Sequence, residues 1–231
     1  MKQSSTIEAS IEHTSIGRVV VPPNVPETFR LFYTTFDFEG RITRPLKDFV
    51  GRPLATCNQV HGSTVHQATG ARHAASGERE CDALWTDQKN LALAIKVADC
   101  LPVTLIDTRG VIANIHSGWR GAVQNITAAT VDSAPLDPAS TIAWLGPAIR
   151  VCCFEVGEEV ASQFEERFVD RTLGSKPHVD IAAFTADVLR NRGIERIADT
   201  GLCTRCEGSI FHSYRRDKRG GRNLAIVAQE G

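Results

Sequence analysis

The chain has 231 residues, 42% of them hydrophobic, which is enough to bury a sizeable core in one domain. Its 26 Lys and Arg residues are balanced by 27 Asp and Glu residues. This balance argues against a nucleic-acid or membrane-surface binder, which would usually carry an overall basic charge, and favours a small-molecule partner.

Targeting signals and cysteine usage predict where the protein works. The polar N-terminus has no apolar segment typical of a signal peptide, and no stretch reaches the roughly 18 apolar residues of a membrane span. The seven cysteines are an odd number in a chain too large to need a disulfide scaffold, so reduced thiols are expected. We therefore predict a cytoplasmic protein without membrane contact, either a monomer or a weak homo-oligomer.

Strands dominate the first half of the chain. Residues 1–17 are polar and predict a loosely ordered lead-in to a single domain spanning residues 1–231. Continuous apolar runs between residues 82 and 117 predict strands covered on both faces, the last two joined as a hairpin at Arg109-Gly110. Further strands are predicted at 18–22 and 29–35, with two short strands within 56–68 and a surface loop at 72–80.

Helices and strands alternate in the second half. Apolar residues at helical spacing predict helices at 119–133, 155–168 and 179–193. Closing strands are predicted at 141–147, 194–200 and 223–229.

Three side chains with metal-binding chemistry stand at predicted strand ends: His61, Cys100 and His116. Two imidazoles and one thiolate suit Zn²⁺ and leave a fourth position for water or substrate, as in catalytic zinc sites. Zinc lowers the pKa of bound water to about 7 and so supplies hydroxide at neutral pH. The alternative is structural, because buried cysteines are common and a histidine at a strand end often only caps a carbonyl.

An anion site is predicted beside this metal site. Gly118 and Arg120 stand at the start of the helix expected from residue 119, where free N–H groups and a guanidinium favour phosphate. Alternatively, Arg120 is a surface side chain lying over Trp119. Asp99 either orients a ligand or faces solvent.

Other cysteines and a basic loop offer weaker signals. Cys152-Cys153 and the CxxC of Cys203 and Cys206 form a rival four-cysteine zinc site, which we rank lower because adjacent side chains are expected to diverge. Cys57 and Cys81 read as small buried residues. The loop at 211–222 carries five basic residues and is either solvated or able to hold a base or phosphate; these are Arg215, Arg216, Lys218, Arg219 and Arg222.

Ordered motifs from about residue 55 to the C-terminus resemble those of the YfiH family, also called the laccase-domain or multicopper polyphenol oxidase family. The matching motifs are Gln59-Val60-His61-Gly62, Ala98-Asp99-Cys100-Leu101-Pro102, His116-Ser117-Gly118-Trp119-Arg120-Gly121, Gly146-Pro147-Ala148-Ile149, Phe154-Glu155-Val156-Gly157 and Phe211-His212-Ser213-Tyr214-Arg215-Arg216.

The resemblance implies an α+β fold, a four-layer α/β/β/α sandwich with mixed sheets, and zinc held by His61, Cys100 and His116. It implies phosphorolysis of adenosine, inosine and S-methyl-5'-thioadenosine, with adenosine deamination as a further activity. On this basis the candidate catalytic residues are Cys100, His116, Arg120 and Asp99. Candidate substrate-binding residues are Arg120, Gly118, Glu155 and Arg215.

The sequence departs from the family pattern at several positions. Residues 32–44 lack the early Gly-Gly-Val-Ser stretch, Phe154 replaces a Tyr, and His212 replaces a Phe. Thr185 and Val188 replace an Asn and a Gln in the helix near residues 180–190. We therefore expect an altered or narrower activity.

Three alternative functions remain open. A copper polyphenol oxidase is disfavoured because a blue-copper site commonly adds an axial Met, and the chain has only Met1. A hydrolase would use Cys100 as nucleophile and His116 as base. A peptidoglycan precursor editing factor would act on a cell-wall precursor instead of a nucleoside.

Overall fold

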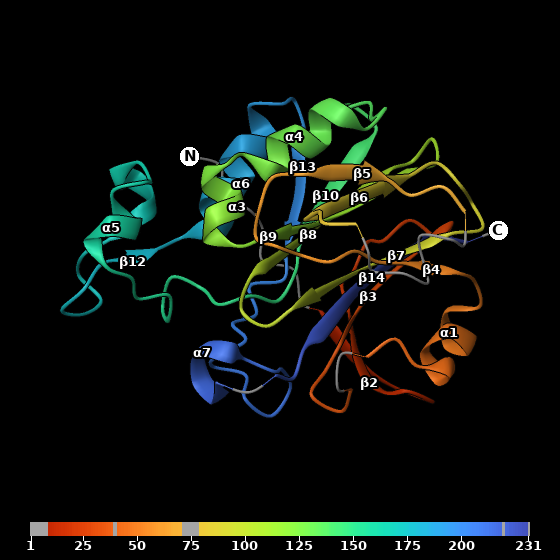
Figure 1. Cartoon of the computed structure of the whole chain (residues 1–231), viewed down its shortest axis with the longest axis horizontal. Helices are drawn as coiled ribbons and strands as arrows, with labels where there is room; N and C mark the ends of the chain where they lie inside the picture. Colours follow the sequence, from red (N-terminus) through yellow and green to blue (C-terminus); the bar gives the residue numbers. More distant parts are fainter. Residues whose placement is uncertain (1–8, 39–40, 71–78, 219, 231) are drawn as a thin grey trace.

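Two six-stranded β-sheets form the centre of the structure (Figure 1). The computed structural model describes residues 9–38, 41–70, 79–218 and 220–230. The first sheet has the order β13 (Arg196–Asp199), β10 (Thr141–Leu145), β8 (Leu101–Asp107), β9 (Val111–Ser117), β6 (Ala83–Thr86), β5 (Val65–Gln67). The second has the order β1 (Ser10–Thr14), β2 (Gly17–Val21), β3 (Phe29–Thr34), β14 (Asn223–Gln229), β7 (Ala92–Val97), β4 (Leu54–Ala55).

Both sheets are mixed. The pairs β10–β13, β5–β6 and β4–β7 are parallel, and the other pairs are antiparallel. A separate small sheet joins β11 (Val169–Asp170) to β12 (His178–Val179), next to the short helix α5 (Glu158–Ala161). In Figure 1 α5 and β12 project to one side of the large sheets.

Three hydrophobic clusters separate four layers. Helices α3 (Trp119–Val123), α4 (Ile126–Ser133) and α6 (Ile181–Arg190) pack on the outer face of the first sheet, around Ile126 and Leu189. Leu31, Ile95 and Trp144 lie in the cluster between the sheets, and α1 (Arg44–Val50) covers the second sheet. The predicted four-layer α/β/β/α arrangement is confirmed.

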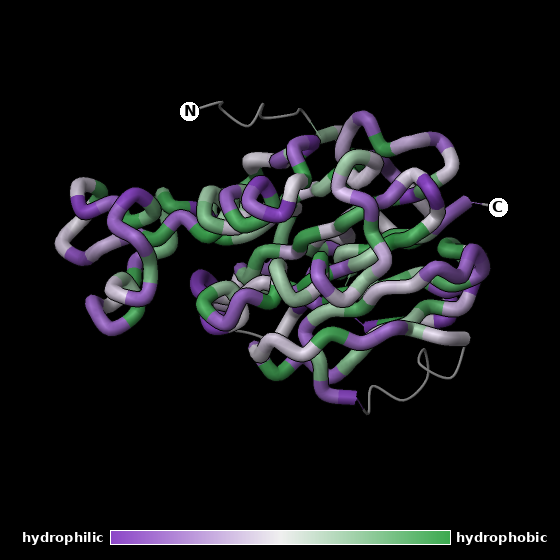
Figure 2. Tube along the Cα trace, turned by 90° about the horizontal axis from the view of Figure 1, so that it is seen from above, coloured by the Kyte–Doolittle hydropathy of each residue, from purple (hydrophilic) through white to green (hydrophobic). Residues whose placement is uncertain are grey.

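Burial explains why the strands form where the sequence predicts them. Every residue of β8 is buried, because helices cover one face of its sheet and the second sheet covers the other. Figure 2 shows hydrophobic segments along the central strands and hydrophilic segments in the outer loops. The predicted β8–β9 hairpin is confirmed, with Pro102 opposite His116.

Two predicted helices are shorter than expected. The helix at 119–133 is divided into α3 and α4 by Asn125, whose φ of 61° is left-handed, a conformation that Asn tolerates. Gly121 lets α3 pack closely, since a Cβ at this position would lie 3.0 Å from the carbonyl oxygen of Gly62.

The helix predicted at 155–168 is reduced to α5 and a 3-10 turn at Glu166–Phe168. Phe164 and Phe168 pack edge-to-face on Phe184 of α6, with ring centroids 5.2 and 5.5 Å away. The apolar spacing that predicted one helix therefore reflects two aromatic anchors on α6.

The predicted loose lead-in at 1–17 is wrong where it can be compared. Ser10–Thr14 forms strand β1, which pairs antiparallel with β2. Its side chains are mostly exposed, so backbone pairing forms the strand without the apolar pattern used for prediction. Residues 1–8 lie outside the described residues, as do most of the predicted loop at 72–80 and Arg219. Within the described part of the chain, no helix is long and apolar enough to cross a membrane.

Candidate metal centre and substrate pocket

The structure brings together the three side chains predicted to hold a metal. One ligand atom each from His61, Cys100 and His116 lies within 4.8 Å of the others, close enough to share one ion. The two imidazole rings are 4.8 Å apart between centroids and nearly perpendicular, at 77°. Cys100 directly precedes β8 and His116 is the last residue but one of β9, so the hairpin register places both at the same end of the first sheet.

Asp82, at the start of β6, orients two of these residues. Its carboxylate lies 2.7 Å from Nδ1 of His116, which leaves Nε2 free to face the site. The same carboxylate accepts N–H bonds from Val60, His61 and Gly62 at 3.2, 3.0 and 2.7 Å. It thus fixes both the ring of His116 and the loop that carries His61, the role that carboxylates play behind metal-binding histidines.

Gln59 holds the other side of the His61 loop. Its side-chain amide donates to the carbonyl of Lys96 at 2.7 Å and accepts from the Lys96 N–H at 2.8 Å. His61 itself has a φ of 62°, which these bonds help to maintain.

Gly118 has a steric role at the site. A Cβ at this position would lie 3.0 Å from Sγ of Cys100 and 3.4 Å from Cδ2 of His61. The absence of a side chain therefore lets the ligands approach one another. Because the following helix α3 has only five residues, the long helix expected behind the predicted anion site is not present.

Cys100 and His116 shift each other's pKa in opposite directions. Burial opposes ionisation of Cys100, but the positive charge of His116 prevails and lowers the thiol pKa to about 6. Burial likewise opposes the charge on His116, and Cys100 with Asp82 raises its pKa to about 9. A metal cation at this position would replace the proton and meet a deprotonated sulfur.

A pocket of about 600 Å³ opens at this cluster. Its volume lies within the range of small-molecule sites. Three aromatic side chains, Trp119, Phe154 and Tyr214, line the pocket. Four cations also line it: Lys96, Arg120, Arg215 and Arg222.

Among the described residues that line this pocket, Asp99 is the only acidic one, and its carboxylate already has two partners. One oxygen accepts from the Thr204 hydroxyl at 2.7 Å and the other from the N–H of Arg215 at 2.6 Å. Asp99 therefore joins separate loops around the pocket. Its catalytic role stays a prediction.

The predicted substrate-binding residues lie in different places. Arg120 lines the pocket but its guanidinium lies 4.4 Å from the centroid of Trp119, as the structural alternative expects. Arg215 also lines the pocket and donates to the carbonyl of Glu155 at 2.7 Å. The Glu155 side chain instead lines a neighbouring pocket, with Lys176 at 3.6 Å.

The basic loop contributes to the pocket only in part. Arg215 and Arg222 line it, whereas Arg216 donates to the carbonyls of Thr204 and Phe211 at 2.9 and 2.8 Å. Arg216 is therefore a structural residue. Sequence reasoning missed Lys96 and Asp82; the only available signal for Asp82 was a charged residue opening an otherwise apolar strand.

Two expectations about the other cysteines have different outcomes. Cys57 and Cys81 are buried, as predicted. The expected divergence of Cys152 and Cys153 is wrong, because both thiols meet those of Cys203 and Cys206. The adjacent pair lies in a turn, where consecutive side chains need not alternate as they do in a strand.

Known proteins resemble this chain over most of its length. Purine nucleoside phosphorylase YfiH of Escherichia coli K12 is 36% identical over 177 residues, which cover 73% of this chain and 71% of that protein. Adenosine deaminase RL5, from an unknown prokaryotic organism, is 34% identical over 148 residues, covering 58% of this chain and 56% of that protein. The prediction of an enzyme agrees with these names.

A solved structure has the same fold. Neisseria meningitidis protein NMB0706 superimposes with a TM-score of 0.80 at 27% identity, covering 90% of this chain and 96% of that one. A family model described as multi-copper polyphenol oxidoreductase laccase matches residues 41–230. The chain therefore belongs to this laccase-domain family, which includes the YfiH proteins.

Proposed function

We propose that the protein is a zinc-dependent purine nucleoside phosphorylase that acts on adenosine, inosine and S-methyl-5'-thioadenosine in the cytoplasm. One observation carries the proposal: the His61–Cys100–His116 cluster lies in a pocket lined by four cations and three aromatic rings. The names of the relatives, including purine nucleoside phosphorylase YfiH, support the same reaction.

The donor set fits zinc. Two imidazoles and a thiolate, with a carboxylate behind one imidazole, form a common three-ligand arrangement with room for a fourth ligand. Copper is the weaker candidate, because the single methionine is Met1 and no axial thioether is available elsewhere in the chain. Zinc in this position would supply a Lewis acid beside the reacting atoms.

The pocket cations suit the second substrate. In phosphorolysis a phosphate oxygen forms a bond to C1' of the ribose while the C1'–N9 bond breaks. The electron pair of that bond goes to the purine, which takes up a proton and leaves. Arg120 and Arg215 would hold phosphate through charge-assisted bonds, with Lys96 and Arg222 adding positive charge.

The aromatic rings suit the purine. Trp119, Phe154 and Tyr214 offer faces on which a base can stack, a contact worth about 1–3 kcal/mol per base. Asp99 acts on the pocket indirectly, by holding Arg215 and the loop of Thr204 in place.

The proposal is tested by phosphate-dependent release of base from adenosine and inosine. Cys100→Ala removes a ligand and is expected to abolish both zinc binding at this cluster and base release. His13→Ala, which changes an exposed histidine in β1, serves as the control and retains both. A folded Cys100→Ala protein with unchanged phosphorolysis would contradict the assignment.

Adenosine deamination is a second candidate, favoured by the name of the relative RL5. It would convert adenosine and water to inosine and ammonia, without phosphate. Separation of the products distinguishes the two reactions: adenine and ribose 1-phosphate arise from phosphorolysis, and inosine arises from deamination. Both activities are expected to disappear together in Cys100→Ala, because they share the metal.

The Cys100–His116–Asp82 chain also has the order of a nucleophile, a base and an orienting carboxylate. Alkylation distinguishes a Cys100 that acts as a hydrolase nucleophile from a Cys100 that is a metal ligand. Zinc is expected to protect Cys100 from iodoacetamide, because a ligated thiolate is not free to react. Rapid alkylation that zinc does not slow would favour the nucleophile.

A further inference from the structure

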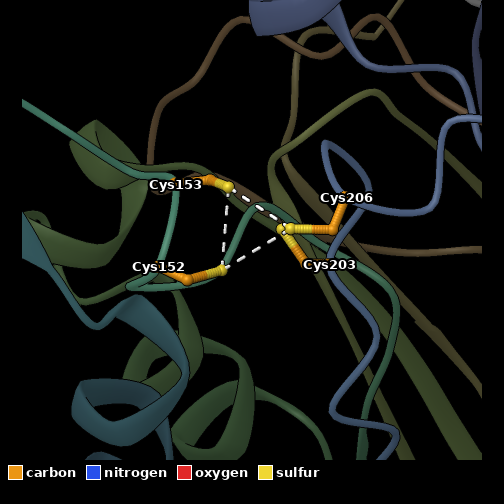
Figure 3. Close-up of side chains that lie close together, drawn as sticks. All are labelled: Cys152, Cys153, Cys203 and Cys206. Carbon is orange, nitrogen blue, oxygen red and sulfur yellow. Dashed lines mark hydrogen bonds between the residues drawn. The ribbon is translucent and has the colours of Figure 1, made fainter.

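Four thiols meet at a second position, outside the pocket. Cys152 and Cys153 lie in a turn after β10, and Cys203 and Cys206 lie in the segment between β13 and α7 (Tyr214–Asp217). Figure 3 shows the four side chains pointing toward one another from these two segments. Their sulfur atoms lie within 4.8 Å of one another.

The sulfur spacing matches a tetrahedral metal site. Zinc–sulfur bonds of about 2.3 Å in a tetrahedron place neighbouring sulfurs about 3.8 Å apart. The Sγ atoms of Cys152 and Cys153 are 3.7 Å apart, and those of Cys152 and Cys206 are 3.9 Å apart. The Sγ atoms of Cys153 and Cys206 are 3.4 Å apart, well beyond the roughly 2.05 Å of a disulfide bond.

The backbone holds the two cysteine segments together. Ala148 donates its N–H to the carbonyl of Leu202 at 3.2 Å, and Thr204 donates to the carbonyl of Ala148 at 2.9 Å. Arg150 reinforces the junction through two bonds to the carboxylate of Asp199, at 2.6 and 2.9 Å. The four thiols are therefore presented by a preorganised scaffold.

Backbone N–H groups of Arg150, Cys206 and Arg205 are directed at the sulfur of Cys203, the buried member of the cluster. Backbone N–H groups directed at sulfur also stabilise the thiolates of metal sites.

We propose that Cys152, Cys153, Cys203 and Cys206 bind one Zn²⁺ in a closed structural site, in addition to the metal of the pocket. Four thiolates fill the coordination sphere and leave no position for substrate, so this ion fastens the chain and takes no part in the reaction. The site does not depend on the proposed phosphorolysis.

The ion would stabilise one wall of the pocket. Thr204 stands between the two cysteines of the CxxC and donates to Asp99, while Ile149 and Phe154 flank the adjacent pair and line the pocket. Coordination of zinc by all four thiolates would hold the two cysteine segments in fixed positions relative to each other. Loss of the ion is therefore expected to loosen the pocket without removing the pocket metal.

The experiment measures zinc per chain in the full-length protein, purified with a reductant and without air. Wild type is expected to hold two equivalents, Cys100→Ala one and Cys203→Ser one. Cys57→Ala, a buried cysteine outside the cluster, is the matched control and retains two. Cys206→Ser, at an exposed position, repeats the test with less risk to folding.

The pattern of equivalents separates the two sites. If only the pocket site is wrong, wild type and Cys100→Ala both hold one equivalent and Cys203→Ser holds none. If the four-cysteine site is wrong, wild type and Cys203→Ser both hold one and Cys100→Ala holds none, which overturns this inference.

Cobalt gives an independent readout that needs no variant of the cluster. In Cys100→Ala, bound Co²⁺ is expected to show the sulfur-to-cobalt charge-transfer and visible bands of a tetrahedral tetrathiolate. Absence of these bands overturns the inference. So does a Cys153–Cys206 disulfide found by mass spectrometry in the zinc-supplemented protein, since it would make the pair a redox couple.

Discussion

Asp82 is the residue on which the geometry of the candidate metal centre depends. Its side chain is completely buried, yet it binds His116 and three consecutive N–H groups of the His61 loop. Replacing one carboxylate oxygen by an amide would leave some of these N–H groups without an acceptor. It would also no longer fix which ring nitrogen of His116 carries the proton.

Asp82→Asn is expected to weaken zinc binding roughly 10- to 100-fold, the usual cost of losing a group behind a metal ligand. Competition with a zinc-sensitive chelator measures this change. Asp87→Asn, an exposed carboxylate just beyond β6, should leave zinc affinity unchanged. Equal affinity in Asp82→Asn and wild type would show that His116 needs no orienting partner.

Element structure explains how residues far apart in sequence reach one site. The hairpin of β8 and β9 brings Cys100 and His116 to one end of the first sheet, and Asp107 closes its other end. The buried Asp107 carboxylate accepts from Arg109, from the N–H of Asp137 and from the Ser140 hydroxyl, at distances between 2.7 and 3.1 Å.

Acid should weaken this hairpin. Burial raises the pKa of Asp107, but the bonds to Arg109, Asp137 and Ser140 outweigh it and hold the pKa well below its usual range. A depressed folded-state pKa contributes stability above the unfolded value near 4, and this stability is lost as pH falls below it.

Asp107→Asn is therefore expected to lower the free energy of unfolding by roughly 2 kcal/mol at pH 7 and to flatten its fall below about pH 4. Denaturant unfolding at several pH values measures both. Asp48→Asn, at an exposed i,i+4 pair with Arg44, should change neither quantity appreciably. An unchanged acid slope in Asp107→Asn would place the pH dependence elsewhere.

At the scale of the whole molecule, most strands could be predicted because two stacked sheets bury both faces of their central strands. The continuous apolar sequences of β7, β8 and β9 reflect this burial on both faces. Helices were harder to predict, since Phe164 and Phe168 have helical spacing but reach α6 through a turn. The exposed strand β1 has no apolar pattern at all.

The candidate site was predictable as far as the chemistry of single residues allows. Residue type and position at predicted strand ends were enough to predict His61, Cys100 and His116 as metal ligands. Asp82 and Lys96 become site residues only through contacts across the fold, with His116 and the Gln59 loop. The four-cysteine cluster was underrated because turn geometry, which decides where Cys152 and Cys153 point, is not visible in their spacing.

The most direct test of the central claim is the rate of adenine release from adenosine and phosphate by metal-free protein, before and after zinc is returned. We predict little release without metal, and restoration by zinc that requires phosphate and fails in Cys100→Ala. Full phosphate-dependent release by the metal-free protein would contradict a metal-dependent phosphorylase.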